Sequence, residues 1–491
     1  MRRRGVPALT GDATLDRHPI LHALLVLCAA SAAVSAPLAV AGNPLEKRLD
    51  SVLRERVLRG ARVGALVVDY ADGRVLYQRE SDRLLVPASN QKILTALAIL
   101  DAFGPTHRFT TQIYADRKPD AEGHVEFLVL RGGGDPGLTS EELWRLAADL
   151  RLQGLRRVRR GLLLDDSAFD AVRWHPGWGP VSSRAYHAPV GALTVNYGTF
   201  AVAVAPGLDQ GGVARVVLDP PVSFLRLVNR ATTSAATDRR TLVVDRESAD
   251  AGEKIVVSGK TPLGGSRKTF YRSVRDPARL AGAVFRSQLE ANGIAVGGEV
   301  RRGRLPASAA LLHEHRGKPL AELVRLFMKF SNNAMGESLV KSLGARAVGG
   351  VGSWENGIPA LAAQLDAVGL DVDQLRIVDG SGLSYDNRVS PRNLVRALRL
   401  AADSFRFGPE FAAALPIAGG DGTLEERAEG AADRVRAKTG LLTRVTALSG
   451  YATLQNGERA IFSILVNGFR GSAERAMSAV DHFVAELVQS D

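Results

Sequence analysis

The segment 87–100 constrains the fold more than any other part of the chain. It reads Pro-Ala-Ser-Asn-Gln-Lys and continues as an almost wholly apolar run over 93–100. Such a run predicts a buried central helix, and Pro87 disfavours helix before it, so the helix should open near Ser89. Ser89 and Lys92 are three residues apart, which puts both side chains on one helix face. A desolvated lysine beside a serine hydroxyl is a general base beside a nucleophile, although a serine here also suits a plain N-cap.

The two ends of the chain predict strands around this helix. Apolar runs at 64–68 and 75–77 flank an Asp-Gly turn, which predicts a hairpin ahead of the helix. Near the C-terminus, 448–452 and 460–466 read as two strands joined by an Asn-Gly turn, and 472–488 reads as a closing helix. We expect the first hairpin and the last strands to share one antiparallel sheet, with the central helix packed against it.

The middle of the chain has a different pattern of apolar and turn residues. From about 109 to 305, short β-like runs alternate with turn residues, which predicts a mainly β insertion in two parts. Helical periodicity returns over 319–343 and continues at 356–369 and 391–403.

The first 41 residues predict an export signal. Arginines at positions 2 to 4 precede an apolar run from Ile20 and small residues that end at Ala41. We expect cleavage after Ala41 and secretion across the inner membrane to the periplasm, with an uncleaved membrane anchor as the alternative. Later apolar runs fall short of the ~20 residues that a membrane span needs, so at most peripheral membrane contact is expected. The single cysteine, Cys28, lies in this segment, so a mature chain from Gly42 has no disulfide.

Charge narrows the class of partner. The chain carries a net charge of +11, of which the first 41 residues contribute +2, leaving +9 for the mature protein. Such a balance favours anionic partners, which for an exported protein include cell-wall polymers and lipid headgroups. Zinc-finger spacing, a basic zipper and an aromatic RNA-binding signature are all missing, so no nucleic-acid partner is expected.

Two further short motifs supply the groups that acyl transfer needs. Ser331-Asn332-Asn333 falls at a break in helical texture, and Lys438-Thr439-Gly440 opens the C-terminal strand pair. Peptide acyl transfer requires a nucleophile, a proton path to the leaving amine, oxyanion donors and a substrate anchor. The hydroxyl of Ser331 can relay a proton, the amide of Asn333 can bind substrate, and the ammonium of Lys438 can hold a carboxylate. We expect no metal and no cofactor.

These three motifs, in this order, resemble the signature of penicillin-binding proteins and serine β-lactamases. The chain looks most like the D-alanyl-D-alanine carboxypeptidase/endopeptidase branch of the penicillin-binding protein 4 type, over nearly its whole mature length. The additional stretches that carry this resemblance are Gly133-Gly134-Asp135-Pro136, Ala188-Pro189-Val190-Gly191-Ala192-Leu193, Asp379-Gly380-Ser381-Gly382-Leu383-Ser384 and Ala437-Lys438-Thr439-Gly440.

The resemblance implies a fold and a domain plan. The fold is multidomain α+β, with a penicillin-recognising serine transpeptidase/β-lactamase-like core and two mainly β inserted domains. The core would comprise 42–105 and 305–491. Inserted domain II would comprise 106–118 and 192–304, and a nested domain III would comprise 119–191.

It also implies catalytic roles. Ser89 would attack the D-alanyl carbonyl and form an acyl-enzyme, and Lys92 would accept its proton. Ser331 would pass a proton to the leaving group, and Asn333 would bind the substrate amide carbonyl. Water would then release the acyl group.

The third motif would bind the end of the substrate. Lys438 and Thr439 would hold the terminal carboxylate, and Gly440 completes the motif. The backbone N–H groups of Ser89 and Leu441 would form the oxyanion hole. The implied partners are peptidoglycan stem peptides, their cross-links and β-lactam antibiotics; no oligomeric state is implied.

Two departures and three alternatives remain open. Leu441 stands where many relatives carry serine or threonine, and Arg444 stands where a small residue is common, so carboxylate binding and cleft size are in doubt. A serine β-lactamase and a non-catalytic penicillin-binding wall protein are alternative functions. Gly132-Gly133-Gly134-Asp135-Pro136-Gly137 also fits a dinucleotide pattern, but Thr139 and Glu142 predict a capping box that starts the next helix after the glycines.

Overall fold

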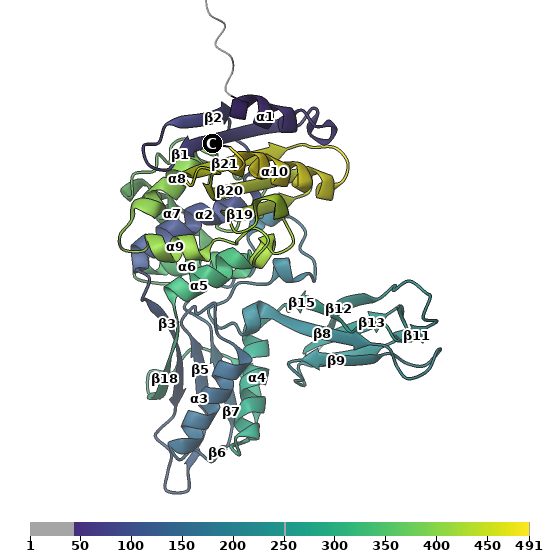
Figure 1. Ribbon diagram of the computed structural model, residues 1–491. Helices are drawn as coiled ribbons and strands as arrows, with labels where there is room; N and C mark the ends of the chain where they lie inside the picture. Colours follow the sequence, from purple (N-terminus) through teal and green to yellow (C-terminus); the bar gives the residue numbers. More distant parts are fainter. Residues whose placement is uncertain (1–43, 250–251, 491) are drawn as a thin grey trace, which may run out of the picture. The chain divides into compact units, whose positions relative to one another are not determined.

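The computed structural model describes residues 44–249 and 252–490. Its central sheet has five strands in the order β19-β20-β21-β1-β2, and every neighbouring pair is antiparallel (Figure 1). The strands are β1 (Arg62–Asp69), β2 (Val75–Arg79), β19 (Val435–Leu442), β20 (Val445–Thr453) and β21 (Arg459–Asn467). Since β1 pairs with β21 along its whole length, the N-terminal hairpin and the C-terminal strands form one sheet, as predicted from the sequence.

Alternate residues of β1 belong to two different cores. Leu66 and Val68 pack into the core that contains the central helix. Ala65 and Val67 pack into a second core on the other face of the sheet. The helices of that second face are α1 (Pro44–Leu53) and α10 (Ala473–Val488). Helices therefore cover both faces, which explains why β1 reads as a continuous apolar run.

The central helix, α2 (Gln91–Phe103), is the predicted one. Every residue from Gln91 to Leu100 is buried, and the helix ends at Gly104, whose φ of 81° stops it. Helices surround it, which is why it has no polar face. The helices that contact it are α5 (Leu320–Lys329), α6 (Asn333–Val348), α7 (Trp354–Ala367) and α8 (Pro391–Asp403). A further helix, α9 (Gly408–Ala414), packs against α5 and α8.

A second five-stranded sheet has the order β17-β7-β5-β3-β18 and combines four strands of the insertion with β18, which lies beyond the expected end of the insertion at 304. Its strands are β3 (Arg108–Ala115), β5 (Leu128–Gly132), β7 (Gly161–Asp165), β17 (Glu299–Arg302) and β18 (Ala310–Pro319). A small sheet of β4 (His124–Val125), β6 (Arg157–Val158) and β16 (Ala295–Val296) and two helices, α3 (Ser140–Leu152) and α4 (Pro277–Ala291), accompany it. The capping box of Thr139 and Glu142 is confirmed, and α3 begins after the glycine run.

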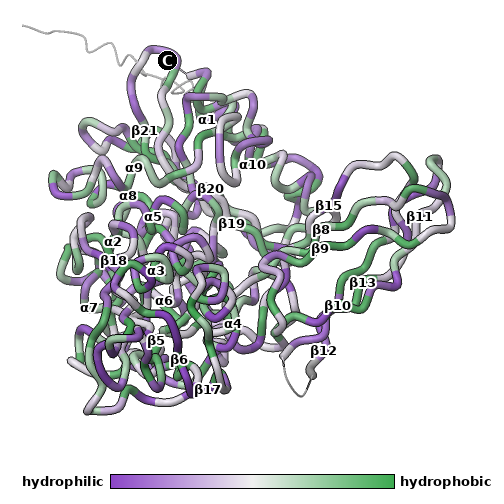
Figure 2. The backbone as a smooth tube through the Cα atoms, turned by 90° about the horizontal axis from the view of Figure 1, so that it is seen from below, coloured by the Kyte–Doolittle hydropathy of each residue, from purple (hydrophilic) through white to green (hydrophobic). Residues whose placement is uncertain are grey.

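The residues from 199 to 273 form three further small sheets. Their orders are β15-β8-β9, β10-β13-β12 and β11-β14. Phe200, Val202 and Val204 of β8 are buried in the core. The strand is green in Figure 2 because its residues after Thr199 are all apolar. The strands are β8 (Thr199–Ala205), β9 (Arg215–Asp219), β10 (Leu225–Asn229), β11 (Thr232–Ser234), β12 (Val243–Ala249), β13 (Gly252–Ser258), β14 (Lys260–Pro262) and β15 (Lys268–Ser273).

Strand pairing divides the insertion at positions other than those expected. Strands on both sides of the expected boundary at 118/119 belong to the same sheet, because β3 pairs directly with β5. The strand β17, near the end of the insertion, pairs with β7 of the expected nested domain. We therefore propose that 199–273 is the nested unit and that the flanking segments form the unit around it.

The predicted export segment, 1–41, lies outside the described residues. Within the described part of the chain, no helix combines the length and apolar character that crossing a bilayer requires.

Candidate active site

Ser89 lies in a single 3-10 turn, Ala88–Asn90, immediately before α2. The preceding residue, Ala88, has a φ of 47°, a left-handed conformation that costs a non-glycine residue free energy and is typical of functional turns. Gly382 comes so close that a Cβ atom there would lie 1.8 Å from the Ala88 carbonyl oxygen. The turn that presents Ser89 is thus held by a neighbouring loop as well as by its own helix.

Lys92 points from the first turn of α2 toward Ser89. Its Nζ donates to Ser89 Oγ at 3.0 Å, to Asn333 Oδ1 at 2.7 Å and to the Ser381 carbonyl at 2.6 Å. The side chain is fully buried, and this desolvation lowers the pKa of Lys92 to about 7, against the opposing attraction of Asp379 and Glu337. A large fraction of Lys92 is therefore neutral near pH 7 and able to accept the proton of the serine hydroxyl.

Asn333 is the first residue of α6, and its side chain is held from two sides. Its Oδ1 accepts from Lys92, and its Nδ2 donates to the Tyr186 carbonyl at 2.9 Å. Tyr186 belongs to a short turn of the insertion, Ala185–His187. The insertion thus orients a side chain of the candidate site, which the sequence did not predict.

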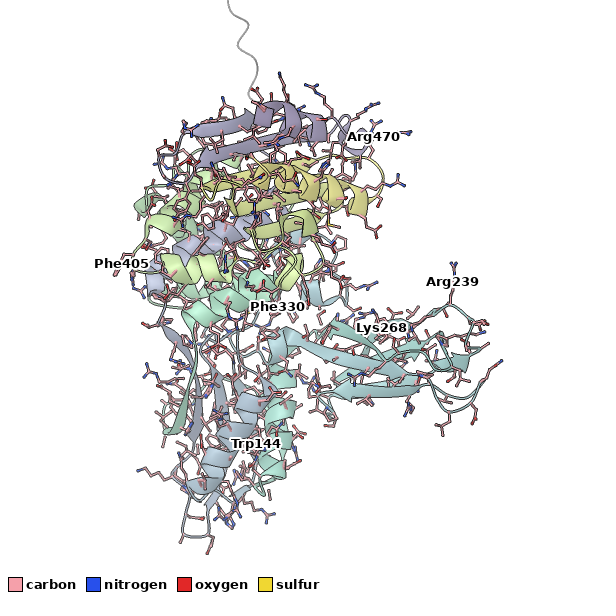
Figure 3. The ribbon with its side chains drawn as sticks, in the orientation of Figure 1. Trp144, Arg239, Lys268, Phe330, Phe405 and Arg470 are labelled. Carbon is pink, nitrogen blue, oxygen red and sulfur yellow. The ribbon has the colours of Figure 1, made fainter. Side chains whose placement is uncertain are left out.

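Ser331 occupies the turn between α5 and α6 and has a φ of 54°, again a strained value for a non-glycine residue. Its hydroxyl lines the same cleft as Ser89, and among the described residues no hydrogen-bond partner occupies it. The preceding residue, Phe330, is 65% exposed and extends outward at the end of α5 (Figure 3). Ser331 is thus free to contact a substrate.

Lys438 lies on β19 below the cleft and not in its wall. It is fully buried, and its Nζ donates to the Thr439 carbonyl at 2.9 Å and to Thr439 Oγ1 at 3.4 Å. Burial, together with the charges of Lys92 and Arg427, lowers the pKa of Lys438 well below its ordinary value. Thr439 lines the cleft above it, so the residue of this motif that faces the cleft is the threonine, with the lysine behind it.

The strand that carries this motif is tied to the serine turn. Asn90 Nδ2 donates to the Lys438 carbonyl at 2.9 Å. β19 is an edge strand of the central sheet. Further along it, Gly440 is buried, whereas the Leu441 side chain is 46% exposed and lines the cleft without a hydroxyl.

Two buried carboxylates hold the loop that supports Lys92. Glu337 accepts from the backbone N–H groups of Ser381 at 2.7 Å and Gly380 at 3.2 Å. Asp379 accepts from the backbone of Gly382 and Ser384, each at 2.7 Å. Both carboxylates are fully buried, and burial beside Asp379 raises the pKa of Glu337. The Asp-Gly-Ser-Gly stretch at 379–382 therefore holds the Ser381 carbonyl that accepts from Lys92.

Trp178 connects the insertion to this support. Its Nε1 donates to Asp379 Oδ2 at 2.8 Å, while its ring stacks on His187 and also lines the cleft. Trp178 thus has both a packing role and a surface in the cleft. The cleft has a volume of about 900 Å³. Its wall residues from the three motifs and from the insertion include Ser89, Ser331, Asn333, Thr439, Trp178 and Tyr186.

Two other features of the insertion lack the chemistry of this cleft. A cavity of about 1,000 Å³ on the outer face of β8 has no serine, cysteine or histidine among its lining residues. Within the described residues, Asp120, Glu122 and His124 are the one group of three or more possible metal ligands whose ligand atoms all lie within 4.8 Å of one another. Asp120 already accepts from the backbone N–H groups of Glu122 and His124, so the turn itself accounts for this cluster.

Comparison with known proteins identifies the family. A family model described as the D-Ala-D-Ala carboxypeptidase 3 (S13) family matches residues 45–487. The chain belongs to the S13 family of D-Ala-D-Ala carboxypeptidases. It is 39% identical over 450 residues to a D-alanyl-D-alanine carboxypeptidase of Actinomadura sp. (strain R39), covering 88% of this chain and 82% of that relative.

A more distant relative and a solved structure support the same family. The D-alanyl-D-alanine carboxypeptidase DacB of Haemophilus influenzae is 27% identical over 431 residues, covering 85% of this chain and 88% of the relative. The crystal structure of penicillin binding protein 4 (dacB) from Haemophilus influenzae superposes with a TM-score of 0.75 at 24% identity, over 89% of this chain and 98% of that one. These likenesses confirm the predicted family, the multidomain α+β fold and the enzyme class, a serine-type D-Ala-D-Ala carboxypeptidase.

Proposed function

We propose that this S13 enzyme hydrolyses D-Ala-D-Ala ends and D-alanyl cross-links of peptidoglycan through an acyl-enzyme on Ser89, and that penicillins inhibit it by acylating the same serine. The observation that carries the proposal is the contact between Ser89 Oγ and the buried Lys92 at 3.0 Å. The relatives' names support the substrate, because both curated relatives are D-alanyl-D-alanine carboxypeptidases.

The geometry supports a two-step reaction. Ser89 Oγ bonds to the carbonyl carbon of the penultimate D-alanine while its proton passes to Lys92. The C–N bond to the terminal D-alanine then breaks, and Ser331 delivers a proton to the departing nitrogen. Water hydrolyses the resulting ester and regenerates Ser89. The backbone N–H groups of Ser89 and Leu441 are the proposed donors to the oxyanion.

Substrate would be held on both sides of the serine. The amide of Asn333, fixed between Lys92 and the Tyr186 carbonyl, would bind the substrate's amide. The terminal carboxylate would meet Thr439, with the Lys438 ammonium beneath it. A carboxylate near that ammonium would favour its charged form and so oppose the effect of burial on its pKa.

The same anchor suits cross-links. A cross-link joins a D-alanyl carbonyl to a side-chain amine whose own D-centre also bears a carboxylate, so the leaving group again presents an anion near Thr439. A solved structure with a TM-score of 0.50 at 13% identity, covering 87% of this chain and 92% of that one, is a peptidoglycan endopeptidase from Bdellovibrio bacteriovorus, but at that identity it shows only a shared fold.

A β-lactamase function is less well supported. Fast release of a penicilloyl group requires a dedicated group that activates water. Among the described residues, those that line the cleft include no aspartate or glutamate, so penicillin is expected to remain on the serine. A non-catalytic wall protein is the other alternative, and the same experiment tests both.

The experiment is intact-protein mass spectrometry combined with product analysis. Incubation with a penicillin should give one stable adduct on Ser89, and incubation with cross-linked peptidoglycan should release D-alanine and separated stem peptides. Ser89→Ala should lose both outcomes with an unchanged circular dichroism spectrum. Rapid loss of the adduct would favour a β-lactamase, an adduct without peptide products would favour a binding protein, and an adduct on another serine would refute the assignment.

A further inference from the structure

Thr423 lies in the same cleft as the three motifs, although it belongs to none of them. It lines the cleft from the short turn Gly422–Leu424, which the chain reaches between α9 and β19. Its Oγ1 is 2.7 Å from Thr439 Oγ1, and either hydroxyl can be the donor. The anchor of the proposed function therefore includes two hydroxyls, one from β19 and one from this turn, in contact with each other.

The strand itself offers too few donors for a carboxylate. Among the residues of β19 that line the cleft, Thr439 has a side-chain donor, whereas Leu441 and Leu442 are apolar. A carboxylate has two oxygens and about four acceptor positions. Thr423 stands where a second hydroxyl can reach the same anion, and both hydroxyls can rotate to donate to it.

The turn that carries Thr423 is held against the end of α5. Lys329 is buried and its Nζ donates to both carboxylate oxygens of Asp421, at 2.5 and 2.7 Å. Gly422 lies so close that a Cβ atom there would be 2.6 Å from the Lys329 carbonyl oxygen. Because Ser331 follows Lys329 by two residues, the same contacts fix Thr423 relative to the Ser331 turn.

The charges around this turn suit an anion. Arg427 also lines the cleft, but Asp481 already accepts from its Nε at 3.1 Å and from its NH2 group at 2.7 Å. Within the described part of the chain, Lys438 Nζ donates to the carbonyl and hydroxyl oxygens of Thr439 and to no carboxylate. An incoming carboxylate would therefore meet two hydroxyls that can rotate toward it, and its charge would favour the protonated form of the buried Lys438 beneath them.

We propose that Thr423 donates a hydrogen bond to the substrate's terminal carboxylate and, with Thr439, sets the enzyme's preference for peptides that end in a free acid. This inference rests on the proposed function, since it assigns a further substrate contact to the same cleft.

The test uses the full-length enzyme and two soluble substrates, an acyl-L-lysyl-D-alanyl-D-alanine peptide and the same peptide with a terminal carboxamide. Thr423→Val removes the hydroxyl at nearly constant volume, and Thr423→Ser retains it. Thr453→Val, at the end of β20 and outside the cleft, is the matched control. The measurement is kcat/KM for both peptides with all four proteins.

Thr423→Val should lower kcat/KM for the free acid by between about 10-fold and 100-fold, the range for losing a hydrogen bond to a charged group. The carboxamide should change little, so the acid preference should fall by the same factor. Thr423→Ser should stay within about 3-fold of wild type, and Thr453→Val should match wild type, because neither change removes a proposed donor.

Equal losses on both peptides would overturn the inference, because a merely structural role moves both. No loss on the acid would overturn it as well. Failure of the proposed function would be seen in the wild type alone, which would then cleave neither peptide or show no preference for the acid. No Thr423 variant is needed to see that result, and the inference would then be overturned as well.

Discussion

Replacing Lys92 with methionine tests the central step of the proposed reaction. The change keeps most of the side-chain volume in a fully buried position at the start of α2 but removes the group that accepts the serine proton. It also removes the donor to the Asn333 side chain and to the Ser381 carbonyl. The variant should fold, because α2 remains apolar and its neighbours are unchanged.

The expected fall in acylation rate follows from the burial of Lys92. Desolvation lowers the pKa of Lys92 from 10.5 to about 7, so that about half of it is neutral at pH 7. An unperturbed lysine would be neutral in only about one molecule in 3,000 at that pH. Loss of a positioned base costs on the order of 10² to 10⁴ in rate, so Lys92→Met should slow acylation by at least ~10²-fold.

The pKa of Lys92 also determines the direction in which the acylation rate changes with pH. Only neutral Lys92 accepts a proton, so the wild-type acylation rate should rise as pH increases through about 7 and fall roughly tenfold per unit below it. Because Lys92 and Lys438 influence each other, the observed midpoint belongs to the pair. In Lys92→Met this rising limb should disappear.

The assay is the rate of covalent labelling by a penicillin, followed by intact mass from about pH 5 to about pH 9. Lys268→Met makes the same chemical change on the exposed surface of the insertion (Figure 3) and should label like wild type. Labelling of Lys92→Met within about threefold of wild type, or a flat wild-type profile, would show that another group is the base.

Three further predictions concern the anchor, the support loop and export. Lys438→Ala should lower kcat/KM for free-acid peptides by an amount that corresponds to ~2–4 kcal/mol of activation free energy. In this variant, amidating the substrate should cause little further loss, and steady-state kinetics measures both effects. Equal effects of the substitution on acid and amide would exclude an anchoring role. Glu337→Gln removes a negative charge near Lys92 and should shift the rising limb of the pH profile to lower pH; an unmoved limb would contradict this. The exported protein should begin near Gly42, and N-terminal sequencing that finds Met1 on a membrane-bound form would favour the anchor.

Several features were predictable from the sequence because short-range interactions determine them. The spacing of Ser89 and Lys92 predicts that both side chains lie on one side of the helix start, and the apolar run behind them predicts a buried helix. The stop at Gly104 and the capping box of Thr139 and Glu142 depend on neighbouring residues alone, and both are present. The order of the three motifs indicated the family, which the comparisons confirm.

The arrangement of the insertion was not predictable in the same way. Parallel and long-range strand pairs, such as β7 with β17, join segments more than a hundred residues apart. Local periodicity identifies such strands without naming their partners. The expected nesting of the two inserted units therefore did not match the observed sheets.

The candidate site shows the same division. The sequence by itself determined the fold family and indicated Ser89 and Lys92 as the candidate nucleophile and base, since helical spacing and apolar runs are local properties. Only the tertiary structure decided that Lys92 contacts Asn333, that Lys438 lies beneath Thr439 and that Thr423 reaches the same cleft. The physical reason is that burial and pairing across the chain set a lysine's pKa and a hydroxyl's partner, and both arise only when distant segments pack together.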